Sequence, residues 1–326
     1  MKSIFFIIYF LLYFSPKILS AIELETRIPP SVWEIEINFK STPRYSKAFN
    51  GYGEKVPLHE LLLWNRDWRE NVEGKLQREK HILEISMVYA FVENWLIKGN
   101  IPFFQKKQIS IMNFESGTSS QKKILSNLDS ENLKGIGDIS LQISNDLCFG
   151  TTWHNRGGIT LRIPTGDSGT PRGTFSNAIG ERHPSIGSFF HFTWFPLVHG
   201  LRNSFRLQGT NELIGNQRET LDAVESYYAA GNCADIYYSW SIERQNFFAG
   251  AELLYFQQSE SKLPTGQSND SVLKEIKLEF GYGILSDLEL KPLILPWQLR
   301  LGYAHPISGQ NTPFAKSWEL TSVLFF

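Results

Sequence analysis

The sequence predicts an all-β fold: a transmembrane, antiparallel, up-and-down β-barrel of about twelve strands. Three observations predict it. An apolar leader begins the chain, segments of alternating apolar and polar residues recur along it, and an aromatic residue ends the last such segment. The composition agrees, because 32 Lys and Arg nearly balance 33 Asp and Glu and 14% of the residues are aromatic. This balance gives no reason to expect nucleic acid or an acidic partner.

The N-terminus has the pattern of a secretory signal peptide. A basic residue near the start is followed by an apolar run to Phe14 and then by small residues. We predict a signal peptide at 1–21, cleaved after Ser20 or Ala21. The barrel domain then occupies 22–326. The alternative is an uncleaved anchor, but the run is short for a membrane-spanning helix. No later apolar stretch is long enough, so the mature chain would cross a membrane with strands.

Period-two alternation justifies each strand in turn. In the first, Trp33, Ile35 and Ile37 alternate with Glu34 and Glu36, as expected for a wall between lipid and a polar lumen. The ninth is less regular, because its polar face also carries large apolar residues. The predicted strands cover 31–39, 83–91, 95–103, 139–144, 159–163, 190–194, 205–208, 235–242, 247–256, 275–282, 297–303 and 318–326.

The predicted connections alternate in length. Short ones follow even-numbered strands, for example Glu93-Asn94, Asn145-Asp146 and 243–246. In transmembrane barrels, short turns face the periplasm and long loops lie outside the cell. The first long loop also has apolar residues at the spacing of an amphipathic helix, although an ordinary external loop is the preferred interpretation. The long loops follow odd-numbered strands and cover 40–80, 105–133, 165–184, 213–231, 258–271 and 305–316.

Charged residues fall on the polar face of the predicted strands. On the lipid face at mid-bilayer, a charge would cost about 2–4 kcal/mol. Opposite charges in a narrow lumen would pair, so we expect low ion conductance that neutralising Arg162 or Arg206 would raise if they form a constriction. The candidate lumen-lining residues are Glu34, Glu36, Glu84, Lys98, Asp138, Arg162, His191, Arg206 and Arg300.

The C-terminus resembles a known signal. The chain ends on Phe326, with apolar residues at alternate positions before it, as in the segment by which bacterial outer-membrane proteins reach their assembly machinery. We therefore expect the outer membrane of a Gram-negative bacterium. The expected partners are outer-membrane lipids, the assembly machinery and a small-molecule permeant, and not nucleic acid.

Three phrases resemble one family. Gly135-Ile136-Gly137-Asp138-Ile139, the segment 158–167 with its ending Pro164-Thr165-Gly166-Asp167, and 33–53 with Phe49-Asn50-Gly51-Tyr52-Gly53 are similar to the outer-membrane family named for the meta-pathway of phenol degradation. The resemblance implies an outer-membrane channel or transporter for small, often aromatic or apolar, neutral compounds. It implies no particular functional residue. Structural explanations also exist, because glycines relieve crowding between strands and Pro-Thr-Gly-Asp makes a turn.

Other functions have less support. Gly166-Asp167-Ser168-Gly169 spells the nucleophile segment of serine proteases, but no matching histidine segment is present. The seven histidines lack zinc-ligand spacing, and the sequence indicates no catalytic residue, metal or cofactor. Cys148 and Cys233 could pair after export or remain separate. The alternatives to a channel are a non-conducting structural or adhesive barrel and an integral outer-membrane hydrolase, for which no Ser–His pattern is evident.

Overall fold

The structure, a computed structural model, describes only part of the chain. It covers residues 30–59, 72–114, 130–149, 153–166, 184–194, 197–198, 201–214, 217–219, 227–229, 233–244, 247–258, 271–284 and 297–326. The predicted signal peptide at 1–21 lies outside these ranges, as do residues 60–71 of the segment considered as an amphipathic helix. Within the described ranges, no helix has the length and apolarity needed to cross a membrane.

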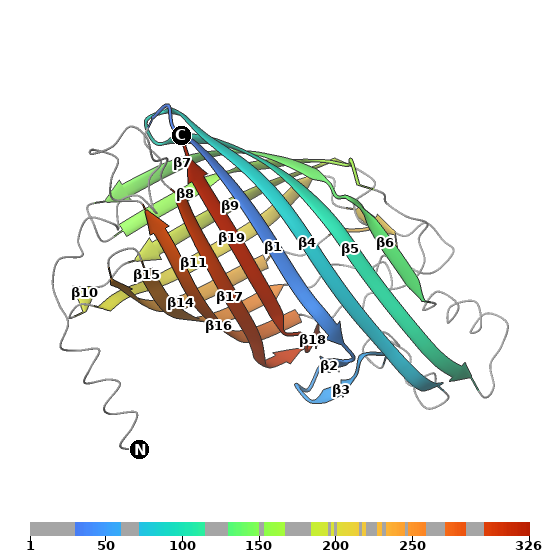
Figure 1. Ribbon diagram of the computed structural model, residues 1–326. Helices are drawn as coiled ribbons and strands as arrows, with labels where there is room; N and C mark the ends of the chain where they lie inside the picture. The colour runs from blue at the N-terminus through green and yellow to red at the C-terminus, as the bar shows by residue number, and fades with distance from the viewer. Residues whose placement is uncertain are drawn as a thin grey trace, which may run out of the picture.

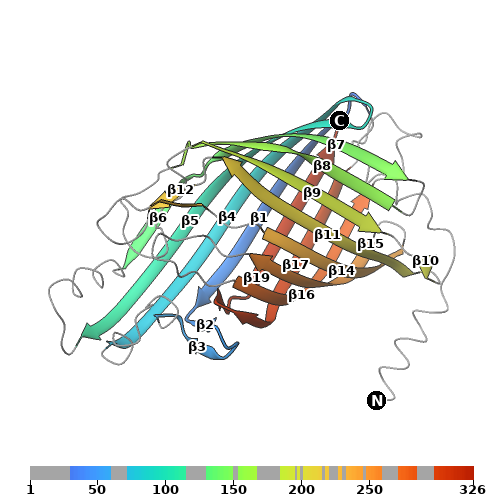
Figure 2. The same cartoon turned by 180° about the vertical axis from the view of Figure 1, so that it is seen from behind.

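Long antiparallel strands form the wall of a barrel (Figures 1 and 2). Each strand pairs with the next along the chain, and the β9–β11 and β19–β1 pairings complete the ring. All the predicted strands are therefore confirmed, and the fold is a transmembrane, antiparallel, up-and-down β-barrel. The twelve strands of the ring are β1 (Trp33–Tyr45), β4 (Val72–Val92), β5 (Trp95–Phe114), β7 (Ile139–Phe149), β8 (Trp153–Ile163), β9 (Ser185–Trp194), β11 (Leu201–Ile214), β14 (Cys233–Arg244), β15 (Phe247–Gln258), β16 (Ser271–Ile284), β17 (Trp297–Gln310) and β19 (Ser317–Phe325).

Short strands extend the wall at its ends. β6 (Glu131–Ile136) pairs with β5 beyond β7, and β10 (Leu197–Val198) pairs with β11. A small sheet of β18 (Thr312–Pro313), β2 (Lys47–Phe49) and β3 (Lys55–Pro57) lies where β1 and β17 end. β12 (Gln217–Glu219) pairs with β13 (Tyr227–Ala229). Together β4, β5 and β6 project past the other strands as a flange (Figure 1).

The two faces of the wall differ as the alternation predicts. Large apolar side chains such as Ile37, Met87, Ile143 and Phe280 are exposed on the outer face. A hydrocarbon layer would cover them, so they form the lipid-facing belt. On the inner face of the same strands, polar or small side chains such as Ser86 are buried. The first and last strands of the ring meet in one seam, where the backbone N–H of Trp33 donates to the carbonyl of Phe326 at 2.8 Å.

Some predicted connections are wrong. Asn145-Asp146 is not a turn, because β7 continues to Phe149, which pairs with Trp153. The turn after β14 begins beyond Arg244, since that residue still pairs with Phe247. β17 also extends to Gln310, where the sequence predicts a loop from 305. A register shift between Lys274 and Glu275 accommodates this extension.

The alternation of loop lengths also fails at one place. The connection between β16 and β17 covers 285–296, which lies outside the described residues. It is longer than the connection at 311–316 between β17 and β19 on the opposite end. The other long connections follow the odd-numbered strands of the ring as predicted.

The barrel topology also decides whether Cys148 and Cys233 can form a disulfide. Cys148 lies one residue from the end of β7 at the short-turn end. Cys233 begins β14 at the opposite end, and β7 and β14 are not neighbours in the ring. A disulfide needs Cα atoms within about 7 Å. The two cysteines therefore do not pair within one chain.

The orientation gives a first prediction. An epitope tag at Ser176 or Thr220, in connections on the long-loop side, should bind antibody on intact cells. A tag between Arg244 and Phe247 should bind only after the outer membrane is permeabilised, because short turns face the periplasm. Flow cytometry before and after permeabilisation measures both. The reverse result would show that the orientation is inverted.

Candidate functional site

The inner face of the barrel is the candidate site. Glu34 and Glu36 on β1, Glu84 on β4, Lys98 on β5 and Arg300 on β17 alternate with exposed apolar residues of the lipid-facing belt and are partly buried. The charge of Glu34 interacts with those of Lys98, Arg156 and Arg300. Arg162 on β8 and His191 on β9 lie on the same face. For Arg206, the structure describes the backbone, which pairs with Thr193 and Tyr237, and its side chain lies outside the described residues.

Asp138 has a different environment from the other candidates. Its Oδ1 accepts a hydrogen bond of 3.0 Å from the backbone N–H of Gly166. Thr165 Oγ1 in turn donates to the carbonyl of Gly137 at 2.8 Å. Two of the phrases that suggested a family therefore meet at one point of the wall. The first phrase forms a β-bulge, since Ile136 pairs with Phe103 but Ser140 with Asn100.

The second phrase begins with a glycine that the packing requires. A Cβ at Gly158 would press against the carbonyl oxygen of Ile143 and lie 2.8 Å from the Cα of Ser144. Both obstacles are backbone of β7 and cannot swing away. We expect Gly158→Ala to lower the free energy of unfolding by about 1–3 kcal/mol.

A matched control exists for this second prediction. A Cβ at Gly99 would meet only Leu141 Cδ2 at 3.7 Å, an ordinary contact. Urea titration of refolded Gly158→Ala and Gly99→Ala in lipid vesicles measures the difference. Equal stability of the two variants would contradict the close approach of β8 to β7.

The first group of inner polar residues joins β7 to β8. Arg156 Nη2 donates to Asp146 Oδ2 at 2.9 Å, and His154 Nε2 contacts Asp146 Oδ1. Asp146 is only 2% exposed. On β9, His191 is the register partner of Arg156, and its ring lies 5.3 Å from that of Phe189. The sequence pattern does not predict the contacts of Asp146, because Asn-Asp is a common turn pair.

The second group takes its residues from three strands. Lys277 Nζ on β16 lies 2.7 Å from Glu319 Oε2 on β19, and Asn38 Nδ2 on β1 donates to Glu319 Oε1 at 2.6 Å. β17 lies between β16 and β19. Lys277 can cross it because Gly302 has no side chain there, and a Cβ at Gly302 would be 2.8 Å from Lys277 Cε. Further along the wall, Asn100 Nδ2 donates to Glu84 Oε1 at 2.6 Å. These contacts run along the wall rather than across the lumen.

An apolar strip also lines the inside. On β15, Phe248, Leu254 and Phe256 alternate with outward residues such as Leu253, and so face the lumen. On β16, Leu273 is the register partner of Phe256. These are the residues that disturb the alternation of the ninth predicted strand. Large apolar residues on the otherwise polar face of this strand are the sequence feature that indicates an apolar lining.

At the short-turn end, inner side chains pack closely. Val88, Ala90 and Leu96 form a buried cluster, and Val323 and Ser144 are almost inaccessible to solvent. The strands come from both ends of the chain, so closure of the seam builds this part of the wall. Among the residues that the structure describes, no group of three His, Cys, Asp or Glu side chains could hold a metal ion.

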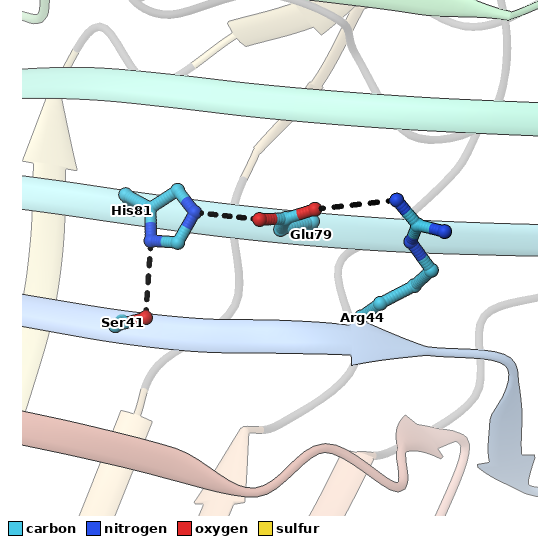
Figure 3. A network of polar contacts seen from close by, with 4 residues as sticks. All are labelled: Ser41, Arg44, Glu79 and His81. Atoms are coloured by element: carbon cyan, nitrogen blue, oxygen red, sulfur yellow. Dashed lines mark hydrogen bonds and ion pairs between the residues drawn. The ribbon is translucent and has the colours of Figure 1, made fainter.

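One serine–histidine contact lies on the outer face of the barrel (Figure 3). Ser41 Oγ is 3.0 Å from His81 Nδ1, and His81 Nε2 is 2.8 Å from Glu79 Oε1. In serine hydrolases the serine contacts Nε2 and the acid contacts Nδ1. Here the order is reversed, and the contacts join β1 to β4. We therefore assign these contacts a structural role in the barrel wall.

Comparisons with known proteins agree with this architecture. No family model matches the sequence, and no curated protein matches it. Among solved structures, the barrel is similar to an outer-membrane channel of Pseudomonas putida F1, with a TM-score of 0.62 and 11% identity over 96% of this chain and all of that one. It is also similar to the β-domain of the Bordetella autotransporter BrkA, with a TM-score of 0.48 and 9% identity over 90% of this chain and 99% of that one.

A third similarity is to the CymD monoaromatic hydrocarbon channel, with a TM-score of 0.35 and 9% identity over 94% of this chain and 90% of that one. At these identities the comparisons bear on the fold, and only the first has a TM-score high enough to support it. The strand ring, the lipid-facing belt and this likeness lead to one conclusion. The chain has the fold of an outer-membrane β-barrel.

Proposed function

We propose that the protein is a channel for small, neutral, aromatic or apolar molecules. The observation that carries the proposal is the inner wall, in which oppositely charged groups pair with each other beside an apolar strip. The pairs Lys277–Glu319 and Arg156–Asp146 are made along the wall. The resemblance of three sequence phrases to an outer-membrane family, which implies a channel or transporter, supports the same proposal.

The order of side chains along β15 and β16 suggests how such a molecule would pass. From the outer end inward, the inner-face register pairs are Phe256 with Leu273, Leu254 with Glu275, Glu252 with Lys277, Gly250 with Glu279, and Phe248 with Gly281. A neutral apolar solute would contact the strip and leave the ion pair intact. An ion would lose hydration in a narrow lumen while gaining little from charges that already have partners.

Swelling of proteoliposomes tests the proposal. Refolded protein should admit small neutral aromatic solutes faster than charged solutes of equal size, and single-channel recording should show low ion conductance. Leu254→Gln/Phe256→Gln should slow the aromatic solutes several-fold, whereas Tyr255→Phe, on the outward face between them, should not.

Two outcomes would contradict the channel proposal. A large, unselective conductance in the unmodified protein would contradict a lumen whose charged groups are paired. Absence of swelling with every solute, from correctly folded protein, would favour the non-conducting structural barrel instead.

A further inference from the structure

The outer face of β1, β4, β5 and β6 changes abruptly from apolar to polar. Across these strands, register partners form rows. One row is apolar, and the next outward-facing row, two residues further along each strand, is polar. At about 3.3 Å per residue, the two rows are separated by about 7 Å along the strands. The apolar row is Phe39, Leu83, Phe103 and Ile136, and the polar row is Ser41, His81, Gln105 and Lys134.

Aromatic residues mark the same level on the other side of β1. Trp318 on β19 is the register partner of Ser41, and Tyr303 on β17 is the partner of Trp318. The rings of Trp318 and Tyr303 pack with centroids 4.5 Å apart. Tryptophan and tyrosine gather where lipid headgroups meet the hydrocarbon. Ser41, the member of the polar row beside these aromatic residues, therefore lies at the level of the lipid headgroups on the long-loop side of the barrel.

A β-bulge turns an arginine toward this level. Thr42 pairs with Lys80 but Tyr45 with Arg78, so β1 has one extra residue between them. The bulge reverses the alternation and brings Arg44 to the outer face, where Nη2 lies 4.0 Å from Glu79 Oε2 (Figure 3). Arg44 keeps 49% of its side chain exposed.

Lysines complete a cationic face. Lys107 on β5 is the register partner of Glu79, Lys134 lies on β6, and Lys75 lies further along β4; all three are exposed. Among the described side chains of this outer face, Glu79 is the one carboxylate, and it already contacts His81 and Arg44. We name Arg44, Lys75, Lys107 and Lys134 the cationic face.

We propose that the cationic face binds the phosphates of a phosphorylated glycolipid in the outer leaflet. The match is amphipathic: acyl chains lie against the apolar row while the phosphates reach Lys134, Lys107 and Arg44 directly above it. Arginine and lysine are the side chains that bind phosphate most strongly, and cations near an anionic membrane surface add to binding. A soluble anion would gain nothing from the apolar row.

Native mass spectrometry of the refolded full chain tests this binding. The probes are bisphosphorylated lipid A and the same lipid after enzymatic dephosphorylation. The unmodified protein should bind the phosphorylated lipid at least about tenfold more tightly. Lys107→Gln/Lys134→Gln should lose about tenfold of that affinity.

The matched control lies on the small sheet of β2 and β3. The variant Lys47→Gln/Lys55→Gln removes two exposed lysines of this sheet, at the same end of the barrel, with the same change in net charge. Heat-modifiable migration on a gel should show that both variants fold. Equal binding of the two lipids, or equal losses of affinity in the two variants, would overturn the proposal.

Discussion

Replacement of Asp146 by alanine should lower the free energy of unfolding by about 3–5 kcal/mol, because it leaves buried charge without its partner. Asp146 is 2% exposed and accepts from both Arg156 and His154. Alanine supplies no acceptor, so the guanidinium of Arg156 and the ring of His154 both lose their partner on β7. Urea titration of the refolded protein in lipid vesicles, followed by tryptophan fluorescence, measures the loss.

Asp146→Asn is the graded control. Asparagine keeps the shape and one acceptor oxygen but removes the charge, so its cost should be smaller than that of alanine. An alanine variant within about 1 kcal/mol of the unmodified protein would contradict the structural role of this group.

Removal of one partner of the Lys277–Glu319 pair should make the proposed channel ion-selective. Glu319→Gln removes one of the carboxylates that act on Lys277 and should shift the selectivity toward anions, whereas Lys277→Gln leaves Glu319, Glu279 and Glu252 and should shift it toward cations. A unit charge about 8 Å from the path, at an effective dielectric constant between about 20 and 80, changes the energy of an ion by about 0.5–2 kcal/mol. That corresponds to a change of about 2- to 30-fold in the permeability ratio.

Reversal potentials under a salt gradient in planar bilayers measure this ratio. The double variant Lys277→Gln/Glu319→Gln is the control, because it removes both charges together and should restore the weak selectivity of the unmodified protein. Shifts of the same sign in both single variants would contradict a lumenal pair.

Much of the wall follows from local sequence pattern. Period-two alternation predicts each strand of the ring, and it also predicts that Glu34, Lys98 and Arg300 lie on the inner face. Errors occur where tertiary contacts outweigh local preference. Asn145-Asp146 has the composition of a turn, but Asp146 stays in a strand because His154 and Arg156 across the sheet stabilise its carboxylate there. Likewise, β17 continues through Pro306 because β16 pairs with it through a register shift.

The candidate site could be predicted only in part. Sequence predicts which residues face inward, but not which of them meet. Lys277 reaches Glu319 across β17 because the stagger of the strands places Gly302 between them, and that stagger depends on the closure of the whole ring. The apolar strip of β15 is visible in the sequence as an interruption of the alternation. Without the register between strands, however, the sequence does not show which residues of the adjacent strands lie beside it.

The sequence by itself determined the fold class, the strands, the two faces of the wall and the aromatic end that meets the first strand. These features depend on the alternation of apolar and polar residues along a strand, which is a local property of the sequence. The tertiary structure alone decided the charge pairs, the bulge that turns Arg44 outward and the separation of Cys148 from Cys233. These depend on register between strands distant in sequence, and register is set only when hydrogen bonds close the ring.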